Sequence, residues 1–181
     1  VVKIGNQLWM SENLKTTKYN DGTSIPNVTD ISAWSNLSTG AWTYYNNIPP
    51  NNAIYGKLYN WYAVNTTKLC PQGWHIPTDA EWTILTDYLG GANMAGGKMK
   101  SVTGWNPPNI GATNVSEFSG LPGGYRDYGS FTDIGKFGFW WSATQFDTDA
   151  AWSRYLTNTS SSFSRIVYSK EQGFSCRCVK D

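Results

Sequence analysis

One helix start constrains this chain more than any other feature. Residues 69–85 read LCPQGWHIPTDAEWTIL, and Thr78 can accept a hydrogen bond from the free amides of a first helical turn. Glu81, three residues later, can reach back to the Thr78 amide, while Asp79 adds negative charge at the positive end of the helix. Apolar residues follow at helical spacing, namely Trp82, Ile84, Leu85, Tyr88 and Leu89. Because a Gly-Gly pair comes next, the pattern predicts a helix of about three turns.

The sequence before this helix predicts short elements separated by turns. The expected elements are a hairpin over 1–10, a turn over 20–23, a short helix over 31–37 and a loop over 46–52. A second main helix is expected to begin near Tyr55. It would carry four large residues at helical spacing, Leu58, Trp61, Tyr62 and Val64.

The sequence after the helix divides into an irregular part and a strand-rich part. Glycine and proline punctuate residues 96–124, and a stretch of this length is usually functional or held by its own packing. Strand patterns then return in four segments, 139–143, 151–156, 164–168 and 174–179, separated by Gly, Asp, Asn and Ser. We therefore expect four antiparallel strands at the end of the chain.

Length and charge exclude several classes of protein. The 181 residues suffice for one domain with a core and are few for two. The formal net charge is +1 and only 15% of residues are charged, which argues against a nucleic-acid partner. No segment approaches the roughly 20 apolar residues that span a membrane, so membrane insertion is not expected. Ten Trp and eleven Tyr favour a loop-rich extracellular domain, in which these rings fill irregular spaces.

Several blocks of the sequence carry a family resemblance. Residues 70–82, CPQGWHIPTDAEW, are similar to the signature of the Fibrobacter succinogenes major paralogous domain, a family of secreted and surface proteins of Fibrobacter and Bacteroidetes. Further blocks resemble that family in the same order, at 2–14, 55–64, 121–126, 140–144 and 173–179. The resemblance therefore covers nearly the whole chain.

The resemblance implies a fold and a location. The family is similar to the C-type-lectin-like fold, in the branch shared with formylglycine-generating enzymes. The implied architecture is a single α+β domain over 1–181, with short antiparallel sheets, two main helices and long irregular loops. The implied location is extracellular or at the cell surface. Likeness of fold does not by itself decide function.

The resemblance also implies that Cys70 and Cys178 lie side by side, and from it we predict a disulfide between them. Such a bridge suits an oxidising compartment. Cys176 would point to the same face of a strand as Cys178 and is expected to be a small buried side chain. The pairing of Cys70 with Cys176 remains an alternative, and the odd count leaves one thiol over.

Candidate catalytic and metal-binding groups are few. His75 is the only histidine, and we expect it to be packed and bonded to nearby backbone, not to serve as a catalytic base. Formylglycine-generating enzymes bind copper through paired cysteines, which makes an oxidase reading of Cys176 and Cys178 the least favoured function. Asp127 and Asp133 could supply oxygen ligands to a structural calcium ion, although no lectin calcium triplet is present. No catalytic residues, metal ligands or cofactor are therefore assigned.

The segment 145–168 has the composition of a contact surface. Aromatic rings give rigid area, while amides and hydroxyls adapt to a ligand. The candidate ligand-binding residues are Phe146, Asp147, Asp149, Trp152, Arg154, Tyr155, Asn158, Phe163, Arg165 and Tyr168. We expect a non-catalytic recognition domain whose partner is a polysaccharide, a glycoconjugate or a surface protein. The alternative is a self-assembling structural subunit, or a decorating domain, of an extracellular appendage or multidomain surface protein.

Overall fold

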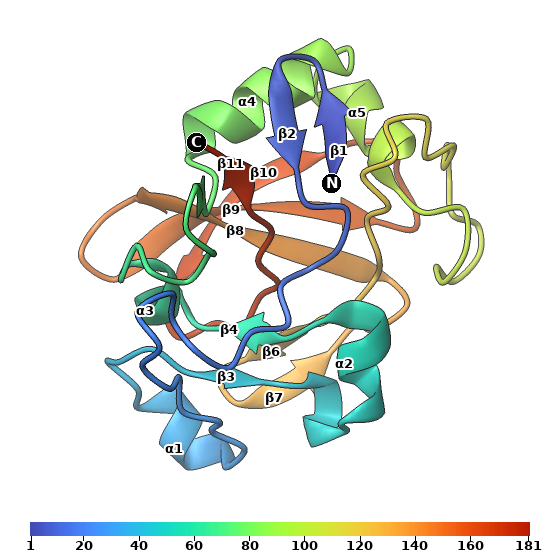
Figure 1. Cartoon of the computed structure of the whole chain (residues 1–181). Helices are drawn as coiled ribbons and strands as arrows, with labels where there is room; N and C mark the ends of the chain where they lie inside the picture. The colour runs from blue at the N-terminus through green and yellow to red at the C-terminus, as the bar shows by residue number, and fades with distance from the viewer.

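Strands from both ends of the chain share one sheet in the computed structural model, which describes residues 1–181 (Figure 1). This sheet has the order β1-β2-β11-β5 and contains β1 (Val2–Ile4), β2 (Gln7–Trp9), β5 (Trp74–His75) and β11 (Val179–Lys180). The predicted N-terminal hairpin is therefore confirmed, and its turn lies at Gly5 and Asn6. No helix of the chain is long and apolar enough to cross a membrane.

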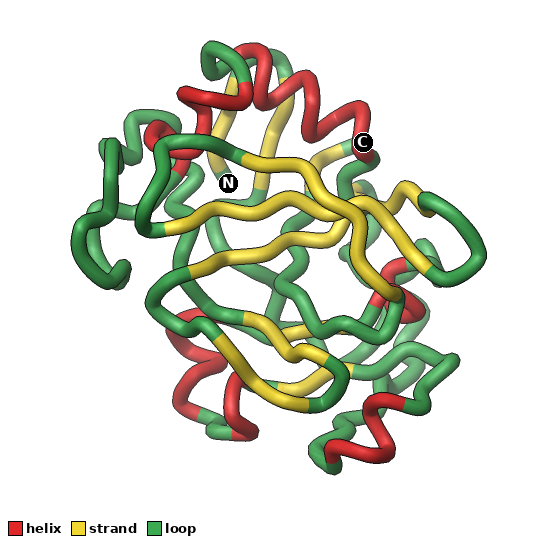
Figure 2. The backbone as a smooth tube through the Cα atoms, turned by 180° about the vertical axis from the view of Figure 1, so that it is seen from behind, coloured by secondary structure: helices red, strands yellow, loops and turns green.

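A second sheet of three long strands runs through the middle of the molecule. Its order is β10-β9-β8, and it contains β8 (Phe137–Gln145), β9 (Ala150–Thr157) and β10 (Ser164–Ser169), all antiparallel. The remaining strands form two small sheets of two strands each. One pairs β3 (Trp42–Thr43) with β4 (Leu58–Tyr59), and the other pairs β6 (Tyr125–Asp127) with β7 (Ser130–Thr132). Figure 2 shows the three long strands side by side, with the β6–β7 hairpin next to them.

The central sheet separates two apolar cores. Alternate residues of β8 point to opposite faces, so that Phe139 and Trp141 enter one cluster and Trp140 enters the other. Trp82 and Leu85 of α4 (Asp79–Tyr88) pack in the second cluster. The first cluster includes the disulfide and Phe174. Several aromatic residues that pack against the first cluster are only partly buried.

The helix that the sequence predicts most strongly is confirmed. The Thr78 hydroxyl accepts a hydrogen bond from the Glu81 amide at 3.2 Å, and the Glu81 carboxylate accepts one from the Thr78 amide at 2.8 Å. Trp82, Leu85 and Leu89 are buried, whereas the flanking residues Ile84 and Tyr88 are exposed. Gly90 and Gly91 have φ values of 99° and 88°, which end the helix in the left-handed region.

The segment 45–64 differs from both predictions made for it. The expected loop contains the 3-10 turn η1 (Tyr45–Asn47) and the start of α2 (Pro50–Tyr55), because proline fits the first turn of a helix. Instead of one long helix from Tyr55, Gly56 at φ 76° ends α2, strand β4 follows, and α3 (Trp61–Val64) is a single turn capped by Asn60. The short helix α1 (Ile31–Ser35), by contrast, forms as predicted.

The predictions for the irregular stretch and for the last strand also need correction. Residues 96–99 of the irregular stretch belong to α5 (Ala92–Met99), in which Gly96 and Gly97 allow the backbone of Ser161–Ser162 and Gly111 to approach closely. Residues 174–178 do not form a fourth antiparallel strand of the central sheet. Ser175 makes an isolated parallel bridge to Trp140, Phe174 an antiparallel bridge to Tyr59, and only Val179–Lys180 is a strand.

The predicted disulfide joins Cys70 to Cys178, and Cys176 remains a buried free thiol as expected. The alternative pairing of Cys70 with Cys176 is therefore not formed. Burial raises the pKa of the Cys176 thiol far above its ordinary value. The bridge links the segment before α4 to the segment that enters β11.

Buried cations hold the loops to the core. Six of the 14 Lys and Arg are buried, and only Arg154 among them has a carboxylate partner. Lys100 donates to the carbonyls of Ile110, Thr157 and Ser160 at 2.7 to 3.0 Å and lies over the Trp105 ring. The other cations without a carboxylate partner are Lys57, Arg126, Lys170 and Arg177, each of which donates to at least one backbone carbonyl and lies over at least one aromatic ring.

Candidate functional site

Four partly exposed aromatic residues from four strands form one surface, which we call the aromatic face. It consists of Tyr125 of β6, Phe137 of β8, Tyr155 of β9 and Tyr168 of β10. Strand alternation explains the arrangement, since Phe137, Tyr155 and Tyr168 lie on the side of the sheet that packs against the first core cluster.

The aromatic face rests on two buried rings. Phe139 lies 4.8 Å from Tyr125, 5.2 Å from Tyr155 and 5.6 Å from Tyr168, measured between ring centroids. Phe174 stacks on Phe139 at 4.8 Å and contacts Tyr125 and Tyr168 from the last segment of the chain. The exposed rings are therefore held in fixed positions by packing, which limits the entropy lost when a ligand binds.

The polar groups of the aromatic face are free to bind. The hydroxyls of Tyr125, Tyr155 and Tyr168 make no hydrogen bond within the protein, and none of them is a buried unsatisfied group. Burial, and after it the charges of Tyr168, Asp127 and Asp133, together raise the pKa of Tyr125 to about 12. Asp127 and Asp133 also raise the pKa of Tyr168, after burial. The hydroxyls of Tyr125 and Tyr168 are thus neutral donors and acceptors beside two carboxylates at neutral pH.

The opposite face of the same sheet carries a cluster of charge and aromatic rings. The Arg165 guanidinium stacks on the Trp152 ring at 3.2 Å, and exposed Phe146 packs edge-on against Trp152 at 5.1 Å. Asp79, at the start of α4, binds Arg165 through both carboxylate oxygens and Arg154 through one. The functional groups of this cluster largely satisfy one another.

The structure distributes the ten predicted ligand-binding residues over several environments. Tyr155 and Tyr168 belong to the aromatic face, and Phe146, Trp152 and Arg165 to the opposite cluster. Asp147 and Asp149 lie in the exposed β8–β9 turn, where Asp147 accepts the amides of Asp149 and Ala150. Three residues are buried and offer no surface to a ligand, which corrects the prediction for Arg154, Asn158 and Phe163.

The three buried residues contact other parts of the protein and so have structural roles. Asn158 donates to the carbonyls of Asn106 and Pro107 and so anchors the irregular stretch. Phe163 packs edge-on against Trp82 in the second core cluster. The sequence did not identify Tyr125 and Phe137 as contact residues, although the alternation of Phe137 with Phe139 and Trp141 was a signal for one shared face.

His75 is bonded to carboxylates and not to backbone, which corrects the prediction. Its Nδ1 lies 2.6 Å from Asp181 Oδ1 and its Nε2 2.8 Å from Glu81 Oε1. Burial lowers the pKa of His75, but these two hydrogen bonds outweigh burial and the pKa is raised above 6.5. Glu81 also belongs to the capping box, so His75 connects Asp181 to the start of α4 through its two hydrogen bonds.

The other candidate chemical groups lie apart. Cys178 is engaged in the disulfide and Cys176 is fully buried, so the pair does not present two thiolates. Asp127 accepts the Gln172 amide at 2.9 Å, while Asp133 lies 3.9 Å from Lys136. No group of three or more His, Cys, Asp or Glu side chains is placed to hold a metal ion.

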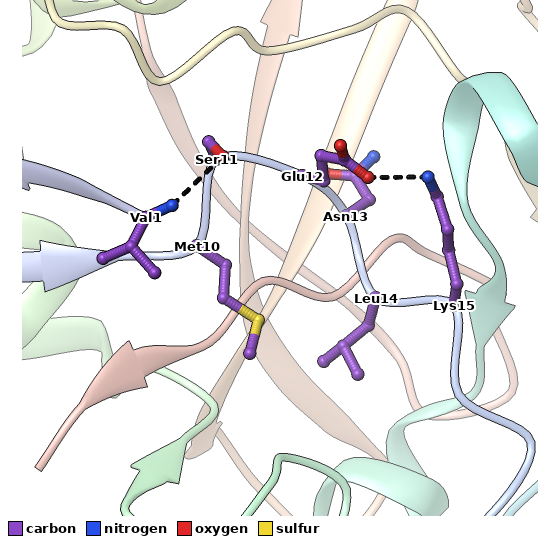
Figure 3. A pocket seen from close by; sticks show the side chains of 7 residues that line it. All are labelled: Val1, Met10, Ser11, Glu12, Asn13, Leu14 and Lys15. Atoms are coloured by element: carbon purple, nitrogen blue, oxygen red, sulfur yellow. Dashed lines mark hydrogen bonds and ion pairs between the residues drawn. The ribbon is translucent and has the colours of Figure 1, made fainter.

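A hollow of about 330 Å³ lies beside the segment after β2 (Figure 3). It is lined by Val1 and by residues 10–15, which include the ion pair of Glu12 with Lys15 at 2.7 Å. Asn13 makes its hydrogen bonds into the interior, to the Tyr55 carbonyl, Ser175, Trp140 and Arg177. This segment is accounted for by packing, so the aromatic face remains the better candidate site.

Comparison with known proteins gives one match. The family model of the Fibrobacter succinogenes major domain matches residues 2–180. The chain belongs to this family. No curated protein and no solved structure matches the chain.

The blocks that carry the resemblance to the Fibrobacter succinogenes major domain meet inside the protein. Trp141 donates to the Tyr59 carbonyl at 2.8 Å, Trp61 to the Ser142 carbonyl at 2.9 Å, and Trp140 to Asn13. Of the aromatic face, only Tyr125 lies in such a block. In this member of the family, the blocks thus build the core, and the candidate site is made mostly by residues outside them.

Proposed function

We propose that this domain is a non-catalytic recognition module that binds a polysaccharide or glycoconjugate through the aromatic face. The observation that carries the proposal is the set of rings fixed by packing, three of which have hydroxyls without a partner in the protein. Sugars are bound by aromatic rings against their apolar faces, together with hydrogen bonds from hydroxyl and carboxylate groups at the edge. Asp127 and Asp133 supply such carboxylates.

The charge of the surface supports a sugar partner over a nucleic acid. None of the 13 Asp and Glu is buried, whereas six of the 14 Lys and Arg are, so that eight cations face thirteen acids at the surface. With a formal net charge of +1 and only eight Lys and Arg outside the core, the surface lacks the excess of cations that binds phosphate backbones. A neutral saccharide needs no such excess.

We further propose that the fold is C-type-lectin-like and that the domain works outside the cell or at its surface. The short antiparallel sheets, the adjacent helices α4 and α5 and the joining of first and last strands in one sheet support the fold. The Cys70–Cys178 disulfide supports the location, since such bonds persist in oxidising compartments.

The test is a glycan array screened with the purified domain, followed by titration calorimetry of any hit. Tyr155→Ala and Tyr168→Ala should each weaken binding by about 5- to 150-fold, because one ring stacked on a ligand is worth roughly 1 to 3 kcal/mol. Tyr155→Phe removes the hydroxyl and keeps the ring, so it measures what the hydroxyl alone contributes to binding. Tyr88→Ala is the matched control, since Tyr88 is an exposed tyrosine on α4.

Two outcomes would contradict the proposal. Folded domain that binds nothing on a broad array would remove its support. Loss of binding in Trp152→Ala with full binding in Tyr155→Ala would place the site on the opposite face of the sheet. Repeating the titration with a chelator tests the less favoured alternative of a structural calcium ion, because an ion at Asp127 and Asp133 would make binding sensitive to its removal.

A further inference from the structure

The outer edge of β10 is open. In the sheet β10-β9-β8, the outer edge of β8 is covered by parallel bridges from Gly124 and Ser175. No strand or bridge lies along the outer edge of β10, although β10 pairs with β9 without interruption over all six of its residues. The central sheet therefore ends on one side only in an unpaired strand.

The backbone groups at this edge can be identified. The Ile166 carbonyl accepts a hydrogen bond from Ser153 Oγ at 3.2 Å, which shows that it points toward β9. Because these groups alternate along an antiparallel strand, the N–H and C=O of Arg165 and Val167 point outward. Neither residue's backbone makes a hydrogen bond to another part of the protein. Each therefore offers one free donor and one free acceptor.

Soluble proteins usually block such an edge with lysine, proline, a bulge or a very short strand. The sequence of β10, SRIVYS, contains no lysine or proline, and its pairing has no bulge. Its one charged residue, Arg165, has its guanidinium engaged by Asp79 and Trp152. The edge thus keeps the properties of a strand that pairs with another strand.

We propose that β10 pairs antiparallel with β10 of a second copy of this chain, about an axis at Val167. Val167 then faces its own counterpart, and Arg165 faces Ser169 of the other copy. Charge favours this arrangement of two copies. Arg165 is the one charged residue of β10, and antiparallel pairing about Val167 places the two Arg165 side chains at opposite ends of the paired strands. Parallel pairing in register would place them side by side, where like charges repel.

The pairing would join two three-stranded sheets into one of six strands. Because the two-fold axis of antiparallel neighbours is perpendicular to the sheet, both aromatic faces lie on the same side of the joined sheet. A long polymer could then contact both copies at once and gain avidity without any new contact. The pairing itself does not depend on what the aromatic face binds.

Analytical ultracentrifugation over a range of protein concentrations tests the proposal. The wild-type domain should dimerise with rising concentration, and hydrogen exchange should show new protection at the amides of Arg165 and Val167. Val167→Lys places two like charges across the axis and should weaken dimerisation by about fivefold. Val167→Pro removes an outward N–H and should do the same while keeping the β9 ladder intact.

The controls make every outcome decisive. Val115→Lys changes an exposed valine far from β10 in sequence and should leave the dimer constant unchanged. Circular dichroism establishes that each variant is folded, and Val167→Lys alone carries the test if Val167→Pro does not fold. A domain that stays monomeric at every concentration, or a dimer that both Val167 variants leave unchanged, overturns the proposal.

Discussion

The guanidinium of Arg154 lies 2.8 Å from the carboxylate of Asp79, where β9 meets the first turn of α4. Asp79 also binds Arg165, and the Arg154 Nη2 donates further to Thr83 Oγ1 at 2.9 Å. Only 5% of the Arg154 side chain is exposed, against 44% for Arg165. Arg154 therefore has a structural role: it holds β9 against the first turn of α4.

Replacing Arg154 should cost far more stability than replacing Arg165. Arg154→Ala removes buried hydrogen bonds from a charged donor, each worth about 1.5 to 3 kcal/mol, whereas an exposed ion pair contributes up to about 1 kcal/mol. Urea unfolding of Arg154→Ala and Arg165→Ala measures both free energies. Equal losses in the two variants would show that the burial of Arg154 does not matter.

The disulfide should contribute more to stability than the free thiol. Cys70 and Cys178 are 108 residues apart, and a bridge across about 100 residues is worth up to about 4 to 5 kcal/mol in chain entropy. Cys70→Ser with Cys178→Ser should lower the free energy of unfolding toward that amount. Cys176→Ala is the control, since it removes the buried free thiol and retains the bridge. A larger loss in Cys176→Ala would contradict the prediction.

The sequence allowed prediction of the elements whose causes are local. The capping box at Thr78 and Glu81 and the hairpin turn at Gly5 need only residues a few positions apart, and both are confirmed. The prediction of one helix over 55–64 was wrong. The apolar spacing of this segment fits a helix, but pairing with distant parts of the chain makes part of it a strand. Tyr59 exchanges backbone hydrogen bonds with Phe174, a partner 115 residues away that local spacing cannot reveal.

The candidate site was predictable only in part, for the same reason. Tyr155 and Tyr168 lie in the segment that composition indicated. Tyr125 joins them because the β6–β7 hairpin packs beside β8 through the bridge of Gly124 with Gly138. The burial of Phe163 and Asn158 depends on α5 and on the irregular stretch, neither of which has a regular sequence pattern. Composition thus located the sheet but did not separate its two faces.

The two bonds of His75 predict a pH dependence of stability. The pKa of His75 is raised above 6.5 in the folded state, so its contribution is complete below pH 6.5 and is lost as the pH rises through the folded value. The melting temperature should therefore fall between about pH 6 and pH 8. Since His75 is the only histidine, His75→Gln should remove that slope. A slope that persists in His75→Gln would assign it to other groups.

Arg126 should hold the aromatic face in place without touching a ligand. Its guanidinium donates to the carbonyls of Gly129, Val28, Thr29 and Asp30 and lies 4.4 Å from the Trp34 ring and 4.9 Å from the Phe131 ring. It is fully buried and has no carboxylate partner. The residue thus fastens β6, which carries Tyr125 and Asp127, to the segment before α1.

Arg126→Met should lower the free energy of unfolding by about 3 kcal/mol, because it removes several hydrogen bonds from a charged donor, each worth about 1.5 to 3 kcal/mol, and the partly buried carbonyls regain some of this loss by binding water. Arg126→Lys should recover only part of this loss, since an ammonium cannot span the fan of carbonyls that the planar guanidinium reaches. Hydrogen exchange should show the loss of protection confined to residues 28–30 and the β6–β7 hairpin. Exchange that rises equally in α4 would mean that Arg126 supports the whole fold and not this corner of it.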